Sequence, residues 1–363
     1  MSILKTQRCC VFCGEKPKDK NREHVIPRWL MDITGGRKKP FDVQMEPKAG
    51  EKIKSKIATD KFVSPSCTEC NSIYAALENE AKAAMAVLLN QTTLTGKQAN
   101  SLLDWFDKVR IGLFINNMML NKGGYITDPH FFIDQRIAAK DRCLLIYKLD
   151  EAKDTKGIAI ISTNDHSFYD SPTSFILIVN DLLFINISSD FLFSERMGFP
   201  YPTSPEIADG KFMADEFSAK FRLFETISRL KYHRPNIELF QSIVDLKIVS
   251  AEHNSMLNNK YILDNSLQMN PLRSKVCAKI GSRYRFIDDG GVIPFGLVPK
   301  NKSKDMISHA IRLYEIKNQL LKSLYDTYPS GHDFLNRNIL YNSRQLVVWN
   351  TYKLASTFVK KKT

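Results

Sequence analysis

Two cysteine pairs, Cys10-Val-Phe-Cys13-Gly14 and Cys67-Thr-Glu-Cys70-Asn71, enclose the tripeptide Glu23-His24-Val25 in the first fifth of the chain. Two residues separate the cysteines of each pair, a spacing that lets both thiolates bind one face of a tetrahedral metal ion. Two such pairs complete a closed four-thiolate zinc site, with buried free cysteines as the alternative interpretation. The sequence therefore predicts a structural Zn²⁺ with four ligands, namely Cys10, Cys13, Cys67 and Cys70.

Cysteine use and the apolar stretches of the chain indicate a soluble cytoplasmic protein. Reduced thiols and a metal suit its seven cysteines better than a disulfide framework does. Cys10 is preferred to Cys9 as the partner of Cys13, because three residues separate Cys9 from Cys13. The first residues have no signal-peptide core, and the most apolar stretch, 175–187, is interrupted by two polar residues. We therefore expect no association with a membrane.

Positive charge is concentrated where the candidate site lies. The chain of 363 residues has a net charge of +13, and residues 1–61 hold 15 Lys and Arg against 8 Asp and Glu. Such an excess attracts phosphodiester chains by displacing their counterions. The length is sufficient for two or three domains, and the composition is that of an ordinary folded protein rather than a disordered one.

The first third of the chain is predicted to contain a hairpin and two helices. Residues 41–45 and 53–57 indicate a Lys-rich, exposed hairpin. Residues 71–89 are rich in Ala and lack Gly and Pro, so they predict a helix that starts at the second cysteine pair. Thr95-Gly-Lys-Gln98 has the pattern of a capping box and predicts another helix, which ends at residues 122–124.

Beyond residue 125 the pattern changes to strands with some helices. Strands are predicted over 143–149, 157–162, 175–179 and 182–187, the last two joined by Asn180-Asp181 as a two-residue hairpin turn. Helices are predicted over 211–231 and 303–328. The predicted fold class is α+β, in three parts: a zinc-bound domain (1–92), a helical connector (93–124) and a larger α+β domain of unknown function (125–363).

Three segments of the first third carry a resemblance to a known family. They are Cys-x-x-Cys-Gly with Glu23-His-Val-Ile-Pro-Arg-Trp-Leu30, then Cys-x-x-Cys-Asn71 running on to Glu78, and then Asp104-Trp-Phe-Asp-Lys108. In order and spacing these segments resemble the HNH endonucleases, members of the ββα-metal or His-Me finger nucleases, and in particular a bacterial branch with zinc-binding cysteine pairs. The resemblance implies a zinc-stapled ββα-metal nuclease domain, and it stops near residue 125.

Hydrolysis of a phosphodiester needs a water nucleophile, a base to take its proton, and positive charge near the leaving 3′ oxygen. His24 is the expected general base, because a neutral imidazole suits that role near neutral pH. By resemblance, Glu23 and Asn71 would coordinate a catalytic Mg²⁺ or Mn²⁺ through their oxygen atoms.

Each of these assignments has a competing interpretation. Adjacent residues of a regular strand face opposite sides, so Glu23 and His24 reach one ion only at a strand end or bulge, or through a water. Asn71 could cap a helix as well as bind an ion. Glu78 lies seven residues further on and could face the same ion or phosphate, or it could pair with Lys82 at i,i+4.

The sequence departs from the family pattern at one position. The middle asparagine of the HNH signature usually lies five residues before the third paired cysteine, where this chain has Phe62. Asp60, Ser64 or Ser66 could orient the imidazole of His24 instead, and the sequence does not choose among them.

Basic residues near the predicted site are candidates for contacts with a nucleic-acid backbone, and a merely solvated surface is the alternative. Contacts of this kind increase the affinity for nucleic acid without selecting a nucleotide sequence. The candidates are Lys16, Lys18, Lys20, Arg22, Arg28, Arg37, Lys38, Lys39, Lys52, Lys54 and Lys56.

These expectations describe a metal-dependent endonuclease that hydrolyses DNA, or RNA. A role in defence against foreign DNA follows from the resemblance alone. One site cuts one strand, so double-strand cleavage would need a homodimer or two successive nicks. Three roles are open for residues 125–363: to sense a signal, to bind a partner protein, or to restrain the nuclease. The alternatives are a zinc-stapled nucleic-acid-binding module without catalysis, and an RNase or toxin that uses the same site.

Overall fold

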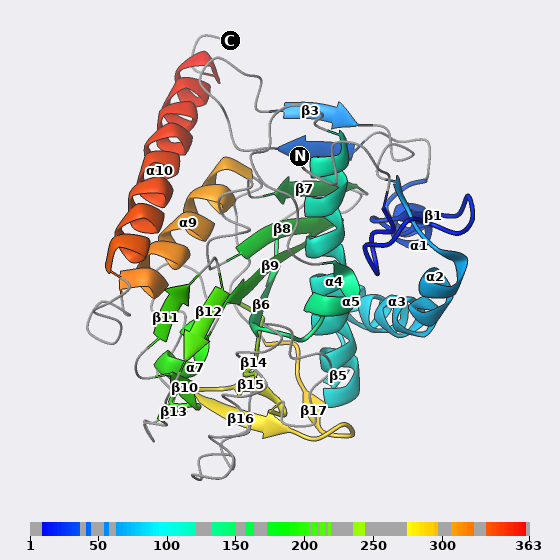
Figure 1. The fold of residues 1–363 in the computed structure, drawn as a ribbon. Helices are drawn as coiled ribbons and strands as arrows, with labels where there is room; N and C mark the ends of the chain where they lie inside the picture. Colours follow the sequence, from blue (N-terminus) through cyan, green and yellow to red (C-terminus); the bar gives the residue numbers. More distant parts are fainter. Residues whose placement is uncertain are drawn as a thin grey trace.

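A nine-stranded sheet forms the centre of the protein. The computed structural model of the chain describes residues 9–36, 41–44, 54–57, 63–120, 132–149, 157–162, 173–189, 191–202, 205–208, 211–214, 217–218, 235–243, 274–296, 306–322 and 332–360. The strand order is β16-β15-β14-β6-β9-β8-β7-β2-β3, and neighbouring strands are antiparallel except for β2 and β7 (Figure 1). The strands are β2 (Phe41–Gln44), β3 (Lys54–Ile57), β6 (Asp141–Lys148), β7 (Ile158–Ser162), β8 (Thr173–Val179), β9 (Leu182–Ser189), β14 (Ile237–Gln241), β15 (Val276–Ile280) and β16 (Arg283–Ile287).

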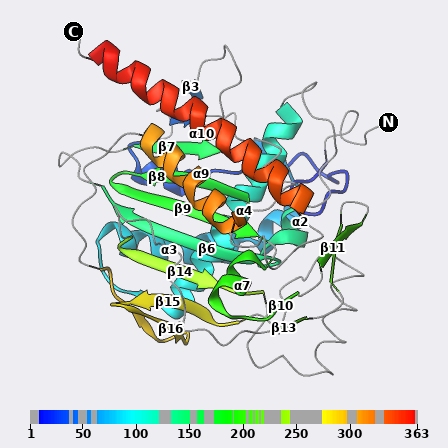
Figure 2. The same cartoon turned by 90° about the vertical axis from the view of Figure 1, so that its left-hand side faces the viewer.

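Alternate residues of the central strands enter two hydrophobic clusters, one on each face of the sheet. Leu144 and Ile146 of β6 belong to the cluster that includes residues of α3 and α4. Leu145 and Tyr147 belong to the cluster that includes residues of α9 and α10, which lie in front of the sheet in Figure 2. Burial on both faces explains the continuous apolar runs of these strands. The helices are α3 (Ala75–Leu89), α4 (Gly96–Leu120), α9 (Met306–Lys322) and α10 (His332–Lys360).

The predicted strands between residues 143 and 187 are confirmed, and so is the turn at Asn180-Asp181. Val179 and Leu182 pair directly across this turn, and Asn180 has a φ of 55°, a conformation that asparagine tolerates. The side chain of Asn180 also accepts a hydrogen bond from the backbone N–H of Gly157 at 3.1 Å. The turn therefore fixes the register of the β8–β9 hairpin and binds the start of β7.

The cysteine pairs and the Glu23-His24-Val25 tripeptide lie on short elements. β1 (Arg22–His24) pairs antiparallel with β4 (Val63–Pro65), and α1 (Arg28–Ile33) follows β1. The predicted helix over 71–89 is in fact two helices, α2 (Thr68–Ile73) and α3, with Tyr74 between them. Tyr74 is held there because its ring stacks on Phe12 and its hydroxyl donates to Asp134 at 2.9 Å.

The predicted capping box at the start of α4 is confirmed. The N–H of Thr95 donates to the Gln98 side chain at 2.9 Å, and the N–H of Gln98 donates to the Thr95 hydroxyl at 3.2 Å. Strand β5 (Leu94–Thr95) also pairs with β17 (Val292–Ile293), and the N–H of Gly96 donates to the carbonyl of Gly291. A distant segment therefore completes the first turn of α4, the helix that lies beside the candidate site.

The predicted hairpin over 41–57 forms as β2 and β3, and it joins the large sheet. β2 pairs antiparallel with β3 and parallel with β7, although both hairpin strands lie in sequence between the two cysteine pairs. One hydrophobic cluster contains Val25 and Leu30 together with Leu144 and Phe184. The predicted division of the chain into domains at residues 92 and 124 stays a prediction. Within the described residues, all three predicted parts contribute side chains to this cluster.

The predicted helix over 211–231 is wrong in its described part. Residues 211–214 form β12, which pairs with β11 (Pro205–Ala208), and Phe217–Ser218 form β13, which pairs with β10 (Tyr201–Pro202). Asp209-Gly210, a dipeptide typical of hairpin turns, lies between β11 and β12 and was overlooked. Residues 219–231 lie outside the described residues. The helix predicted over 303–328 is confirmed over 306–322, and its last residues also lie outside.

None of the helices in the described ranges is long and apolar enough to cross a membrane. The longest of them, α10, carries charged and amide side chains through its 29 residues.

Candidate metal centre

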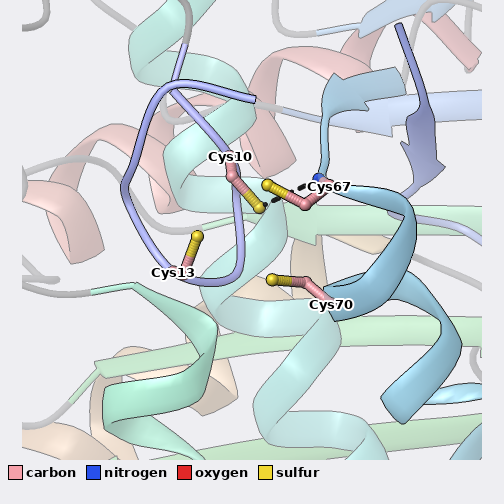
Figure 3. Close-up of side chains that lie close together, drawn as sticks. All are labelled: Cys10, Cys13, Cys67 and Cys70. Atoms are coloured by element: carbon pink, nitrogen blue, oxygen red, sulfur yellow. Dashed lines mark hydrogen bonds between the residues drawn. The ribbon is translucent and has the colours of Figure 1, made fainter. Parts of the chain in front are cut away.

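The four paired cysteines converge on one point. Cys10 and Cys13 lie in the loop before β1, Cys67 precedes α2, and Cys70 lies in its first turn. Their sulfur atoms all lie within 4.8 Å of one another (Figure 3). Four sulfurs bound to one Zn²⁺ are about 3.8 Å apart, given the usual bond length and tetrahedral angles. The arrangement could therefore hold a metal such as zinc after a small contraction.

Backbone hydrogen bonds and a glycine shape the loop of the first pair. The N–H of Cys10 donates to the carbonyl of Glu15 at 2.7 Å, and the N–H of Cys67 donates to the sulfur of Cys10 at 3.3 Å. Gly14 has a φ of +81°, and a Cβ atom there would lie 2.3 Å from the ring of Phe132. This loop is therefore packed directly against the segment that leads into α5 (Ile133–Arg136).

The sulfur atoms are close enough to disfavour several thiolates without a cation. Burial raises the pKa of the Cys70 thiol, and hydrogen bonds and negative charge from Cys13 and Cys10 raise it further. A divalent ion would compensate this charge, which is why metal binding to thiols releases protons. Cys10 belongs to the cluster and Cys9 does not, as the spacing predicted.

Glu23 and His24 face opposite sides of β1. The strand is regular, because Glu23 pairs with Ser64 and His24 pairs with Val63 without a bulge. Glu23 is buried, with 7% of its surface exposed, whereas His24 is half-buried. The conflict foreseen from the sequence is therefore real, and no bulge resolves it within the strand. A direct role of Glu23 as ligand of an ion beside His24 does not fit this register.

Glu23 belongs instead to a buried ion cluster, which consists of Glu23, Glu78, Lys108, Trp29 and Trp105. The ammonium of Lys108 donates to Glu23 at 2.6 Å and also to Glu78. Glu78 further accepts hydrogen bonds from the indole N–H groups of Trp29 at 2.7 Å and Trp105 at 3.2 Å. These contacts replace the predicted pair of Glu78 with Lys82. They leave the carboxylate of Glu78 occupied rather than directed at an ion beside His24.

Two carboxylates share one ammonium in this ion cluster. Burial raises the pKa of Glu23, and the Lys108 charge only partly opposes that effect. The pKa of Lys108 is raised too: burial alone would lower it, and the combined attraction of Glu78 and Glu23 outweighs burial. The two shifts have different main causes: burial acts on Glu23, and the two carboxylates act on Lys108. The raised pKa of Lys108 favours its charged form near neutral pH.

His24 contacts a guanidinium on the other side of the strand. The Nε of Arg28, at the start of α1, donates to Nε2 of His24 at 3.4 Å. A neutral imidazole can accept a hydrogen bond through Nε2, and the neutral form is the one that a general base needs. Arg28 itself is exposed and can reach a bound anion.

Asn71 lies next to the metal centre but not at a helix end. It follows Cys70 within α2, its N–H donates to the carbonyl of Cys67 at 3.0 Å, and Cys67 occupies the N-cap position. The N-cap interpretation of Asn71 is therefore wrong. Its side chain is half-buried, one residue from a cysteine of the metal centre.

The structure removes one of the residues proposed to orient His24. Ser64 pairs with Glu23 and so lies on the opposite side of the strand pair from His24, where its hydroxyl accepts a hydrogen bond from Asn116 at 2.9 Å. Ser66 is buried one residue beyond β4. Asp60 and Phe62 lie outside the described residues.

The predicted basic residues are only partly described. Those in the described ranges are all exposed and lie after the first cysteine pair, up to the first residue of α1: Lys16, Lys18, Lys20, Arg22 and Arg28. Outside the described residues are Arg37, Lys38, Lys39 and Lys52, together with the side chains of Lys54 and Lys56 on β3.

Lys108, Trp29 and Asn116 were not assigned a role from the sequence. The available signal was weak: Lys108 and Asn116 are two of several polar residues among the apolar residues of α4, and both are buried. Comparison with known proteins adds nothing to the assignment, since the chain matches no protein-family model, no curated protein and no solved structure.

Proposed function

We propose that the protein is a metal-dependent HNH-type endonuclease that hydrolyses DNA, with a structural Zn²⁺ bound by the four cysteines. One observation supports this most strongly. The three segments that resemble HNH nucleases are far apart in sequence, yet Glu23 and Trp29, Glu78, and Trp105 and Lys108 meet in one buried ion cluster. The ammonium of Lys108 also lies 5.8 Å from the ring centre of Phe12, which stands between two of the metal-centre cysteines.

The order of the elements is also consistent with a ββα arrangement. β1 and β4 form an antiparallel pair, and α2 follows β4 directly. His24 lies at the end of β1 and Asn71 lies in α2, so both are attached to this unit. The proposal therefore places the base on a strand and an oxygen donor on the helix, where Asn71 directly follows Cys70.

In this proposal His24 takes the proton of the attacking water through Nε2, after Arg28 moves to the substrate. The guanidinium of Arg28 would then bind the phosphate under attack, which keeps positive charge beside the developing negative charge. A Mg²⁺ or Mn²⁺ ion would be held by Asn71 and by phosphate and water oxygens, because Mg²⁺ usually keeps several waters. Such an ion would stabilise the leaving 3′ oxygen. Glu23 has no direct part in this scheme.

The test is cleavage of a supercoiled plasmid and of a structured RNA, each with Mg²⁺, Mn²⁺ or EDTA. We expect plasmid nicking that EDTA abolishes, and a decrease of about 10²- to 10⁴-fold in His24→Ala. The zinc content of that variant should equal that of the wild type. Lys353→Ala, an exposed change on α10, is the control and should nick normally. Nicking at the wild-type rate by His24→Ala would show that another residue is the base.

A second candidate is a zinc-stapled nucleic-acid-binding module without catalysis. The position of Glu23 favours it, because a carboxylate that is buried against Lys108 is lost as a ligand of a catalytic ion. This candidate predicts that the purified protein shifts DNA in a gel but nicks none with either metal. Cleavage of the RNA alone would instead indicate an RNase.

A further inference from the structure

Strand β1 is attached to helix α4 by charge. The side chain of Lys108 is 3% exposed and that of Glu23 is 9% exposed, and their 2.6 Å contact joins the middle of β1 to the middle of α4. His24 is the next residue of the same strand and faces the other way. Any movement of Glu23 therefore moves the backbone that carries the imidazole.

We propose that Lys108 is a positioning residue for His24, which it holds in place through Glu23. This inference rests on the proposed function, in which His24 is the base. Without the ammonium, Glu23 and Glu78 would be two carboxylates in a buried site with no cation between them. A charge left unpaired in a protein interior is strongly unfavourable. Glu23 would move towards water, and β1 would move away from α4 with it.

Glu78 is less able than Glu23 to leave the ion cluster. Its carboxylate accepts two indole hydrogen bonds in addition to the contact with Lys108, and it lies on the first turns of α3. Among the described residues, Lys108 is the one side chain that hydrogen-bonds to Glu23, which lies on a two-stranded sheet. Loss of Lys108 is therefore expected to move β1 rather than α3.

Helix α4 is a firm reference for this contact because it is also bound to the large sheet. Arg142 of β6 is fully buried, and it pairs with Asp104 at 2.5 Å and Asp107 at 3.0 Å. Arg142 also donates to Gln241 of β14. These contacts stabilise α4 against the sheet, whereas the contact between α4 and β1 is made by Lys108.

The test compares Lys108→Met with Arg142→Met in the full-length chain. Both changes remove a buried cation. Lys108 lies on α4 and pairs with Glu23 of β1, whereas Arg142 lies on β6 and pairs with two aspartates of α4. We expect Lys108→Met to lower kcat for plasmid nicking by up to about 100-fold, with KM nearly unchanged, because small displacements of a base have effects of that size. Zinc content should not change. Arg142→Met should lower the melting temperature and leave kcat of the folded protein within about threefold, the spread expected for a change remote from the base.

Two further measurements keep the inference testable. In Glu23→Gln/Lys108→Met an uncharged amide replaces the carboxylate, so no unpaired charge drives residue 23 out of the cluster and kcat should recover part of the loss. If Lys108→Met does not fold, kcat is measured on this double variant instead. The NMR signals of the His24 imidazole should shift in Lys108→Met and stay at their wild-type positions in Arg142→Met.

The outcomes separate the two proposals. If the wild-type protein does not nick DNA, the proposed function fails, and the NMR comparison alone still decides whether Lys108 positions His24. If the wild type nicks and Lys108→Met retains its kcat and its His24 signals, the positioning role is wrong. An equal loss of kcat in Lys108→Met and Arg142→Met would also contradict it, because general destabilisation would then explain both.

Discussion

The Nζ atom of Lys108 lies 2.6 Å from Oε1 of Glu23, although 85 positions separate the two residues in sequence. This contact crosses from the middle of a long helix to a strand of three residues. The buried ion pair adds a contact with α4 to the pairing of this short strand with β4. The candidate base therefore depends on a residue that does not touch it.

Substitution of a single cysteine is predicted to remove the metal. Cys10→Ser should lower the zinc content from about one ion per chain to near zero, because a site with three thiolates binds zinc far more weakly. The melting temperature should decrease as well, since metal binding contributes to folding. Metal analysis of the purified proteins is the measurement. Cys9→Ser is the matched control and should keep its zinc; loss of zinc in this variant alone would assign the site to Cys9.

Gly14→Ala is predicted to destabilise the first cysteine loop by roughly 1–3 kcal/mol, because the site is overpacked as well as strained. The added Cβ would meet the ring of Phe132 at 2.3 Å. Gly36→Ala is a suitable control, because Gly36 also has a positive φ, of +108°, and nothing lies within 4 Å of its added Cβ. Chemical denaturation should show a larger loss for Gly14→Ala. Equal losses would mean that the contact with Phe132 has no energetic role.

The buried carboxyl of Glu23 is predicted to make stability depend on pH. Because burial raises its pKa, the folded protein keeps this proton to a higher pH than the unfolded chain does. The stability that comes from this proton is present at low pH and is lost as pH rises through the folded-state pKa. The free energy of unfolding of the wild type minus that of Glu23→Gln should therefore decrease as pH rises above the unfolded-state pKa of Glu and through the folded-state pKa of Glu23. Urea unfolding at several pH values measures it, and an increase over that range would contradict the assignment.

The exposed basic residues are predicted to set the salt dependence of DNA binding. Lys20→Ala, Arg22→Ala and Arg28→Ala should each weaken binding to all sequences alike and reduce the slope of log K against log salt by about one. Fluorescence anisotropy with a short duplex, at several salt concentrations, measures the slope. Lys353→Ala is the control for a general loss of charge. A slope unchanged in the three variants would show that this surface does not contact the phosphates.

Local patterns in the sequence were sufficient to predict the metal centre and several elements. The spacing of the cysteines selected Cys10 over Cys9, the capping box located the start of α4, and Asn180-Asp181 located a hairpin turn. Each of these features depends on residues a few positions apart. The spacing rules of tetrahedral metals, helix caps and tight turns therefore apply to them directly.

Features that depend on distant residues were not predicted. The partner of Glu23 is a lysine on a helix whose place in the fold is fixed by the large sheet, and no local pattern gives that distance. For the same reason the sequence offered an ion, a phosphate or Lys82 as the partner of Glu78, and not Lys108. The break at Tyr74 likewise follows from contacts with Phe12 and Asp134 rather than from helix propensity.

The parallel pairing of β2 with β7 has a consequence for how this protein can evolve. The loop between the cysteine pairs supplies two strands to the border of the large sheet, so its removal would leave β7 as an uncovered edge, open to aggregation. Replacement of the first third by the corresponding part of an unrelated protein would disrupt both the segment between the cysteine pairs and the large sheet. We therefore expect this segment and the sheet to be inherited together, rather than exchanged separately by recombination.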